Sequence, residues 1–106
     1  MVVRGEIWLV SLEPTQGSEI RKTRPCVVIS PGEMHDHLRT AIIAPMTTGS
    51  KPAPYRIPIT SAGKKGLILL DQIRTVDKSR LISKLGAISA KTLSATLATL
   101  QEVFLE

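Results

Sequence analysis

The sequence predicts a mainly β domain, a compact and partly open barrel, that ends in one C-terminal helix. Short apolar segments recur between Ile7 and Ile88, and loops rich in Gly, Pro and charged residues separate them. No segment of helical period stands between these apolar segments, and only the last part of the chain changes to that period. Because no helix separates successive strands, a β-barrel is favoured over a βαβ sheet.

The first half of the chain contains three expected strands. Residues 7–12 alternate between two sets that are both largely apolar, which indicates a strand covered on both faces. Residues 26–30 form the second, which Pro31 and Gly32 end, and residues 40–46 form the third. The segment 33–39 between them is expected as a polar connection.

The second half is expected to begin with an edge strand. Residues 55–60 alternate, but Pro58 has no N–H to donate to a ladder. Residues 61–66 contain two glycines and two lysines and are expected as a turn. Residues 67–73 are strongly apolar up to the polar pair Asp71-Gln72, and residues 81–88 are expected to form a last short strand pair.

Two helical features complete the chain. Residues 77–80 resemble a single helical turn. Further on, Leu93, Leu97, Leu100 and Phe104 recur at steps of four, three and four, which is one stripe of an α-helix, with Ser89 as its N-cap. The stripe is expected to pack on the core, and a partner-binding face is the alternative.

Length and composition limit the function. The chain has 106 residues, and one domain is expected over 1–106. Its formal net charge of +5 is compatible with a polyanionic partner. With one Trp, one Tyr and one Phe it lacks a strip of stacking aromatics, so any RNA contact must depend on charge, hydroxyls and backbone.

The single cysteine, Cys26, excludes an intramolecular disulfide. Neither a signal peptide nor an apolar run of about 20 residues is recognised, so we expect a cytoplasmic protein without a membrane span.

Two polar clusters follow or precede apolar strands. The loop between Gly17 and Pro25 carries one carboxylate, Glu19, and three cations, Arg21, Lys22 and Arg24. The second cluster, Thr47-Thr48-Gly49-Ser50, follows the third strand. If those strands are neighbours, both clusters lie at the same edge of one sheet. The site would then hold a carboxylate, an arginine and hydroxyls, and the chain shows no metal-ligand spacing because His35, His37 and Cys26 do not form a sensible ligand set.

Several motifs together resemble the MazF/PemK-type toxins, the endoribonuclease half of bacterial toxin–antitoxin pairs. The resemblance covers nearly the whole chain. Its residues are Arg4-Gly5-Glu6-Ile7-Trp8, Pro14, Gly17-Ser18-Glu19, Arg24-Pro25, Ala44-Pro45-Met46-Thr47-Thr48 and Leu69-Leu70-Asp71-Gln72-Ile73-Arg74-Thr75-Val76-Asp77.

The resemblance implies an SH3-like barrel of the CcdB/MazF/PemK type that forms a homodimer. It also implies sequence-specific cleavage of single-stranded RNA, without a metal or other cofactor, to 2′,3′-cyclic phosphate and 5′-hydroxyl ends. A cognate antitoxin is the implied inhibitor. The family's catalytic residues fall on Arg24, Thr47 and Glu19, with Thr48 as the reserve for Thr47. Expected RNA contacts are Ser18, Lys22, Thr48, Gln72 and Arg80.

The chemistry of these residue types agrees with such a reaction. Cleavage through the 2′-hydroxyl needs a base, a group that stabilises the phosphorane and an acid for the leaving 5′-oxygen. Arg24 can grip phosphate oxygens with two N–H groups, Thr47 can donate a hydrogen bond, and Glu19 can accept the proton. His35 or His37 would be suitable acids chemically, since the pKa of imidazole lies near 6.5.

Two other function classes stay open at this point. A gyrase poison of the CcdB type would share the fold and would not need Arg24. A catalytically silent RNA-binding barrel would bind RNA without shortening it. Fold alone does not separate these classes.

Overall fold

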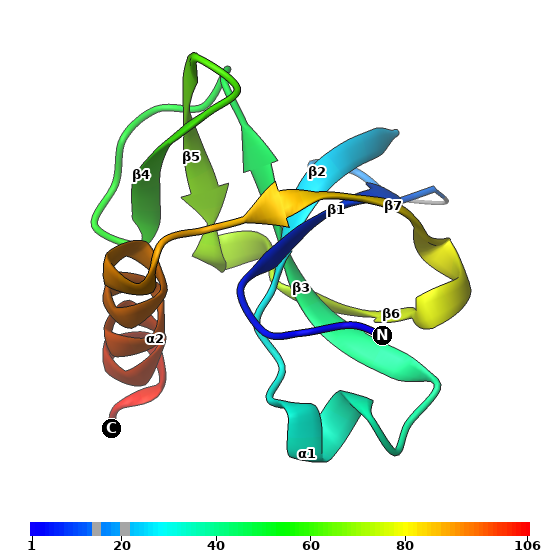
Figure 1. Ribbon diagram of the computed structural model, residues 1–106. Helices are drawn as coiled ribbons and strands as arrows, with labels where there is room; N and C mark the ends of the chain where they lie inside the picture. The colour runs from blue at the N-terminus through cyan, green and yellow to red at the C-terminus, as the bar shows by residue number, and fades with distance from the viewer. Residues whose placement is uncertain (14–15, 20–21) are drawn as a thin grey trace.

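One antiparallel sheet of seven strands dominates the computed structural model, which describes residues 1–13, 16–19 and 22–106 (Figure 1). The strands are β1 Glu6–Ser11, β2 Thr23–Val28, β3 Thr40–Thr47, β4 Arg56–Ser61, β5 Lys64–Leu69, β6 Arg74–Asp77 and β7 Leu81–Ala87. The helices are α1 Gly32–His35 and α2 Ala90–Phe104, and Leu70–Gln72 (η1) and Lys78–Arg80 (η2) are 3-10 turns.

The strand order is β4-β5-β3-β2-β1-β7, and β6 pairs with β3 outside this path. One side of β3 pairs with β2, while β5 and β6 share the other side. The β5 partner lies at Met46 and Thr47, and the β6 partner lies at residues 40–43. The order begins at β4 and ends at β7, so the barrel is partly open. The expected mainly β barrel with a C-terminal helix is confirmed.

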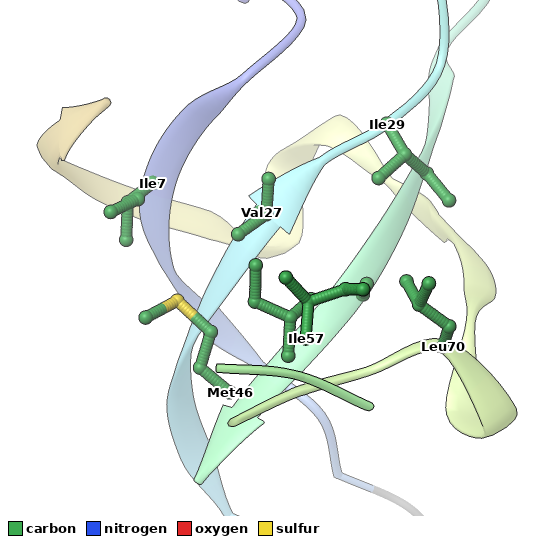
Figure 2. Close-up of a cluster of buried hydrophobic side chains, with 8 residues drawn as sticks. Ile7, Val27, Ile29, Met46, Ile57 and Leu70 are labelled. Atoms are coloured by element: carbon green, nitrogen blue, oxygen red, sulfur yellow. The ribbon is translucent and has the colours of Figure 1, made fainter. Parts of the chain in front are cut away.

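Apolar side chains fill both faces of the strongly curved sheet. One cluster contains Ile7, Val27, Ile29, Ala44, Met46, Ile57, Ile68 and Leu70 (Figure 2). The other contains Val10, Leu12, Cys26, Val28, Ile43 and Val76. Successive side chains of a strand point to opposite faces, so β1 and β2 each contribute to both clusters. The expectation that the first strand is covered on both faces is confirmed.

Four expectations for local structure are wrong. The expected connection 33–39 begins inside α1, to which residues 33–35 belong. Residues 64–66 belong to β5, because the turn of the β4–β5 hairpin needs only Ala62 and Gly63. The segment 67–73 leaves the sheet after Leu69 and bends into η1, and the unexpected strand β6 follows. Residues 81–88 supply one strand, β7, which pairs with β1. Short polar strands such as β6 depend on a neighbour, here β3, and carry little pattern of their own.

Other expectations for local structure are confirmed. β4 is an edge strand that contains Pro58. The Ser89 hydroxyl accepts from the Thr92 N–H at 3.1 Å and caps α2. The Asp77 carboxylate accepts from the Ser79 N–H at 2.9 Å and caps η2.

The helix stripe is only partly buried. Leu93, Leu97 and Leu100 are half-buried, and Leu100 packs against the first cluster. Phe104 is 71% exposed, so the prediction that it packs on the core is wrong. Figure 1 shows α2 beside β4 with its C-terminal end projecting away from the sheet, which is why Phe104 is exposed.

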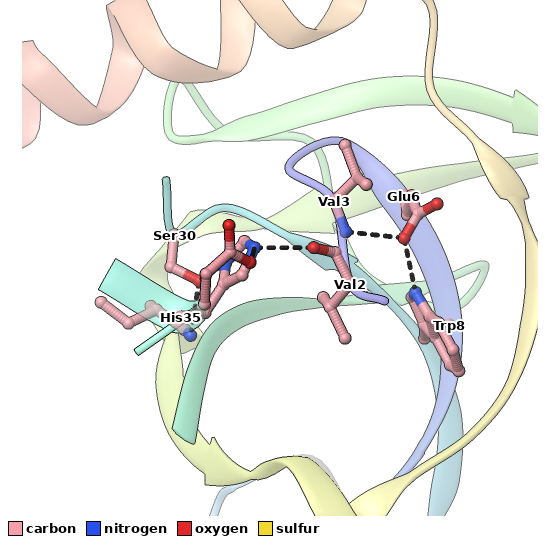
Figure 3. Close-up of polar contacts among 8 residues, drawn as sticks. Val2, Val3, Glu6, Trp8, Ser30 and His35 are labelled. Atoms are coloured by element: carbon pink, nitrogen blue, oxygen red, sulfur yellow. Dashed lines mark hydrogen bonds and ion pairs between the residues drawn. The ribbon is translucent and has the colours of Figure 1, made fainter. Parts of the chain in front are cut away.

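A buried carboxylate joins the N-terminal motif to β7. The Lys84 ammonium lies 2.6 Å from Glu6 Oε2, and Trp8 Nε1 donates to Glu6 Oε1 at 3.1 Å. The Val3 N–H also donates to Oε1, at 2.8 Å (Figure 3). These bonds satisfy a carboxylate that is only 6% exposed, so this motif glutamate has a structural role.

Candidate active site

Two adjacent strands bring Arg24 and Thr47 to the same edge of the sheet. Cys26 pairs with Pro45, Val27 with Ala44 and Val28 with Ile43. The same antiparallel register, continued by two residues, sets Arg24 opposite Thr47. The expectation that the two polar clusters lie at one edge is therefore confirmed for these two residues.

Arg24 and Thr47 line one hollow of about 620 Å³. The β4–β5 hairpin and β7 form its other walls. The lining residues are Arg24, Pro25, Met46, Thr47, Thr48, Ile59, Ser61, Ala62, Lys64, Gly66 and Leu85. Two cations and three hydroxyls among them form a surface suited to a phosphodiester, because Arg and Lys attract the phosphate and hydroxyls donate to its oxygens.

The backbone around Thr47 is held tightly. The Gly49 N–H donates to Thr47 Oγ1 at 3.2 Å, so the hydroxyl oxygen is oriented by its own turn. On the other side β5 passes so close that a Cβ at Gly66 would lie 2.8 Å from the Thr47 carbonyl oxygen. The Thr47 side chain thus stands on a fixed strand end, which is the kind of support that a positioned donor needs.

Ser18, Glu19 and Gln72 line a second hollow, of about 330 Å³, with Asp71, Ile73 and Arg74. The Glu19 side chain is exposed, and its Oε1 accepts from the Gln16 N–H at 2.6 Å while the Glu19 N–H donates to the Gln16 carbonyl at 3.1 Å. Glu19 therefore closes its own turn. It does not line the hollow of Arg24 and Thr47, so its role as the base stays a prediction.

Lys22 and Arg80 lie at the base of the same loop. The Lys22 N–H donates to Glu13 Oε1 at 2.9 Å, and the Lys22 backbone is left-handed at φ 69°. Arg80 Nη1 donates to the carbonyls of Ser11, at 3.3 Å, and Glu13. Arg80 therefore holds the end of β1, and its contact with RNA stays a prediction.

Both histidines lie away from the hollow. His35 is fully buried, with Nδ1 2.9 Å from Ser30 Oγ and Nε2 2.8 Å from the Val2 carbonyl oxygen (Figure 3). His37 is exposed in the turn before β3, which begins at Thr40. At about 3.4 Å per residue, this end of β3 lies roughly 24 Å from Thr47. Neither histidine lies in the hollow of Arg24 and Thr47, so the geometry gives no support to a histidine as the catalytic acid.

The hairpin residues Ser61 and Lys64 also line the hollow, although the sequence pattern indicates only a turn at residues 61–66. They reach the hollow because β5 pairs with the end of β3, through Leu67 opposite Thr47.

Arg21, Pro14 and Ile20, which belong to the predicted loop, lie outside the described residues. Over residues 1–13, 16–19 and 22–106, no cluster of three His, Cys, Asp or Glu side chains could hold a metal ion. Within the same residues no helix has the length and apolarity for crossing a membrane.

Comparisons with known proteins agree with this fold. The family model described as PemK-like, MazF-like toxin of type II toxin-antitoxin system matches residues 3–104. Endoribonuclease PemK of Escherichia coli is 32% identical over an alignment 106 residues long, and this alignment covers 94% of this chain and 80% of that protein.

Two solved structures have the same fold. MazF of Deinococcus radiodurans superimposes with a TM-score of 0.85 at 24% identity, over 96% of this chain and 94% of that one. A mycobacterial endoribonuclease, solved in complex with its cognate antitoxin, gives a TM-score of 0.83 at 18% identity over 100% and 98% of the two chains. Sequence and fold thus place this chain in the PemK-like, MazF-like family of toxins of type II toxin–antitoxin systems.

Proposed function

We propose that the chain is a sequence-specific endoribonuclease toxin that cleaves single-stranded RNA without a metal. The observation that carries the proposal is the meeting of Arg24 and Thr47 at paired strand ends in one hollow, with Thr48, Ser61 and Lys64 around them. Its relative from Escherichia coli, which is named an endoribonuclease, supports the same conclusion.

The reaction follows from what these groups can do. The 2′-oxygen attacks the phosphorus, the bond from phosphorus to the 5′-oxygen breaks, and the products are a 2′,3′-cyclic phosphate and a 5′-hydroxyl. Arg24 stabilises the negative charge of the phosphorane with a guanidinium that stays protonated. Thr47 donates a hydrogen bond to a non-bridging oxygen. Glu19, on the loop that leads into β2, takes the proton of the 2′-hydroxyl, and solvent water gives a proton to the leaving 5′-oxygen.

The recognition of RNA is assigned to the second hollow and the loop base. Ser18 and Gln72 face the substrate from the hollow that Glu19 also lines. Lys22 contacts a phosphate from the loop base, and Arg80 contributes a second contact beside it. Thr48 binds the strand next to Thr47. These contacts position the strand and read its bases through hydroxyl and amide groups, because stacking aromatics are scarce.

Two partners belong to the proposal. A cognate antitoxin with an acidic, partly disordered segment would lie across the basic hollow and exclude RNA. Antitoxin binding that persists undiminished when Arg24, Lys22 and Lys64 are neutralised would count against this docking site. A homodimer is supported by Ile82 and Leu85, which are 57% and 54% exposed on the edge strand β7. A monomer in sedimentation equilibrium at micromolar concentration would contradict it. The cytoplasm, where its RNA substrate is found, is the proposed location.

The experiment uses a long single-stranded RNA in EDTA, with a DNA of the same sequence beside it. Wild type should give discrete fragments with cyclic-phosphate ends, and Arg24→Ala should give almost none. Arg39→Ala is the matched control, because Arg39 is exposed at the opposite end of β3 and the substitution removes the same charge. Intact RNA with folded wild type would refute the proposal. Inhibition of supercoiling would then indicate a gyrase poison, and an RNA gel shift a silent binder.

A further inference from the structure

The side chain of Arg56, at the start of β4, joins three separate segments. Its Nε and Nη2 donate to Oδ1 and Oδ2 of Asp71 at 3.2 and 3.0 Å, so the two groups meet at two points. Its Nη1 donates to the Lys51 carbonyl oxygen at 3.0 Å, and its guanidinium carbon lies 5.7 Å from the centre of the Tyr55 ring. Only a planar guanidinium can make all these contacts at once.

The pair is partly shielded from solvent. The Arg56 and Asp71 side chains are 20% and 30% exposed. The hydrogen bonds from the guanidinium are the main cause that lowers the pKa of Asp71 below its ordinary value. Both of its oxygens accept from Arg56, and this neutralises a carboxylate that would otherwise repel phosphate from the second hollow.

The segments that Arg56 joins carry residues of both hollows. Asp71 belongs to η1, and the next residue, Gln72, lines the second hollow with Ser18 and Glu19. The Lys51 carbonyl belongs to the segment 48–55, which begins at Thr48 in the first hollow. The Leu70 N–H, which donates to the Tyr55 carbonyl at 3.2 Å, ties the same two segments through the backbone.

We propose that Arg56 and Asp71 are positioning residues for RNA binding. They fix η1, which ends at Gln72, and the segment 48–55, which begins at Thr48, relative to each other. This inference rests on the proposed function. Neither residue takes part in bond breaking, so their loss should weaken substrate binding and leave the chemical step intact. Arg56→Lys keeps the positive charge but loses the two N–H donors that reach both oxygens of Asp71, whereas Asp71→Asn keeps the volume and loses the charge.

The test measures kcat and KM for a short RNA that contains one wild-type cut site. Each single variant should raise KM about tenfold, which is ~1.4 kcal/mol of binding, and leave kcat within about twofold. The double variant should be no worse than the weaker binder of the two, because both changes break one unit. Urea unfolding of each variant supplies the folded fraction.

A matched control is Lys84→Gln, which breaks the ion pair of Lys84 with Glu6. Neither of those residues lines the two hollows. A merely structural loss lowers the folded fraction and hence the apparent kcat, and it leaves KM unchanged, so this control should keep its KM. Should Arg56→Lys fail to fold, Asp71→Asn carries the test alone.

The outcomes separate the two claims. A raised KM in Arg56→Lys and Asp71→Asn, with an unchanged KM in the control Lys84→Gln, supports the inference. An unchanged KM in Asp71→Asn beside an active wild type overturns the inference and leaves the proposed function standing. Absence of cleavage by wild type overturns the proposed function, and the positioning role with it.

Discussion

Replacing Gly66 with alanine should strain the strand end that carries Thr47. The new Cβ would lie 2.8 Å from the Thr47 carbonyl oxygen and 3.4 Å from the carbonyl carbon. An ordinary contact between carbon and oxygen is about 3.3–3.6 Å, so β3 and β5 must separate by roughly 0.5 Å or more. Both contacts are backbone atoms inside a ladder, and a side-chain rotation cannot relieve them.

The magnitude follows from two opposing terms. Overpacking of this kind costs about 1–3 kcal/mol. The alanine restricts the unfolded chain and returns about 0.4–1 kcal/mol. The free energy of unfolding should therefore fall by about 1–2 kcal/mol. A displacement of 1 Å at a reacting group can cost about 10² in rate, so a shift of half that size at Thr47 should lower kcat roughly tenfold.

Urea unfolding and RNA cleavage kinetics, corrected for the folded fraction, measure both effects. Gly49→Ala is the control, because its Cβ would lie 3.9 Å from Thr47 Oγ1, an ordinary contact. This control should be at least as stable as wild type and retain its kcat. If Gly66→Ala matched Gly49→Ala in both stability and kcat, the tight support of Thr47 would be refuted.

Three further predictions concern buried groups. His35→Ala leaves Ser30 and the Val2 carbonyl without their ring partner, so the free energy of unfolding, measured by thermal unfolding, should fall by about 2–4 kcal/mol. Cleavage per folded molecule should stay unchanged, and a lost kcat would instead indicate a catalytic role for the histidine. Burial raises the pKa of Glu6, but hydrogen bonds from Lys84, Trp8 and the Val3 N–H outweigh it and lower that pKa below its ordinary value of 4.5. The stabilisation that ionised Glu6 contributes is thus full above about pH 4.5 and is lost as the pH falls. The urea midpoint of wild type should therefore drop on acidification, and that of Glu6→Gln should drop less. An equal dependence of the midpoint on pH in the two proteins would contradict this. Burial raises the pKa of the Cys26 thiol to about 12, so iodoacetamide at pH 8 should label it only after unfolding, and rapid labelling of the native protein would be the contrary result.

The strands that carry strong apolar patterns were predictable, and the elements that depend on partners were not. Apolar runs located β1, β2 and β3, and Pro58 marked the edge strand. β6 carries the polar sequence Arg-Thr-Val-Asp and exists because it pairs with β3, a contact between distant parts of the chain. The exposure of Phe104 depends on where α2 meets β4, which helical period alone cannot determine.

The candidate site was predictable where two strands fix it. Arg24 and Thr47 each follow or precede an apolar strand, so the shared edge could be inferred before the register was known. The position of Glu19 depends on a loop whose path the sequence pattern does not determine, and the structure places it in a different hollow. Lys64 and Arg56 gained their positions only from the hairpin and its ladder with β3, a tertiary arrangement.

The central claim, that Arg24 and Thr47 act as one catalytic centre, is tested most directly by a double-mutant cycle of single-turnover cleavage. Arg24→Ala and Thr47→Val should each lower the rate about 10²–10³-fold in folded protein. The double variant should cleave about as slowly as the slower single variant, because the two groups act as one unit on the phosphorane and neither is effective without the other. Multiplicative losses, or wild-type rates in either single variant, would contradict the account.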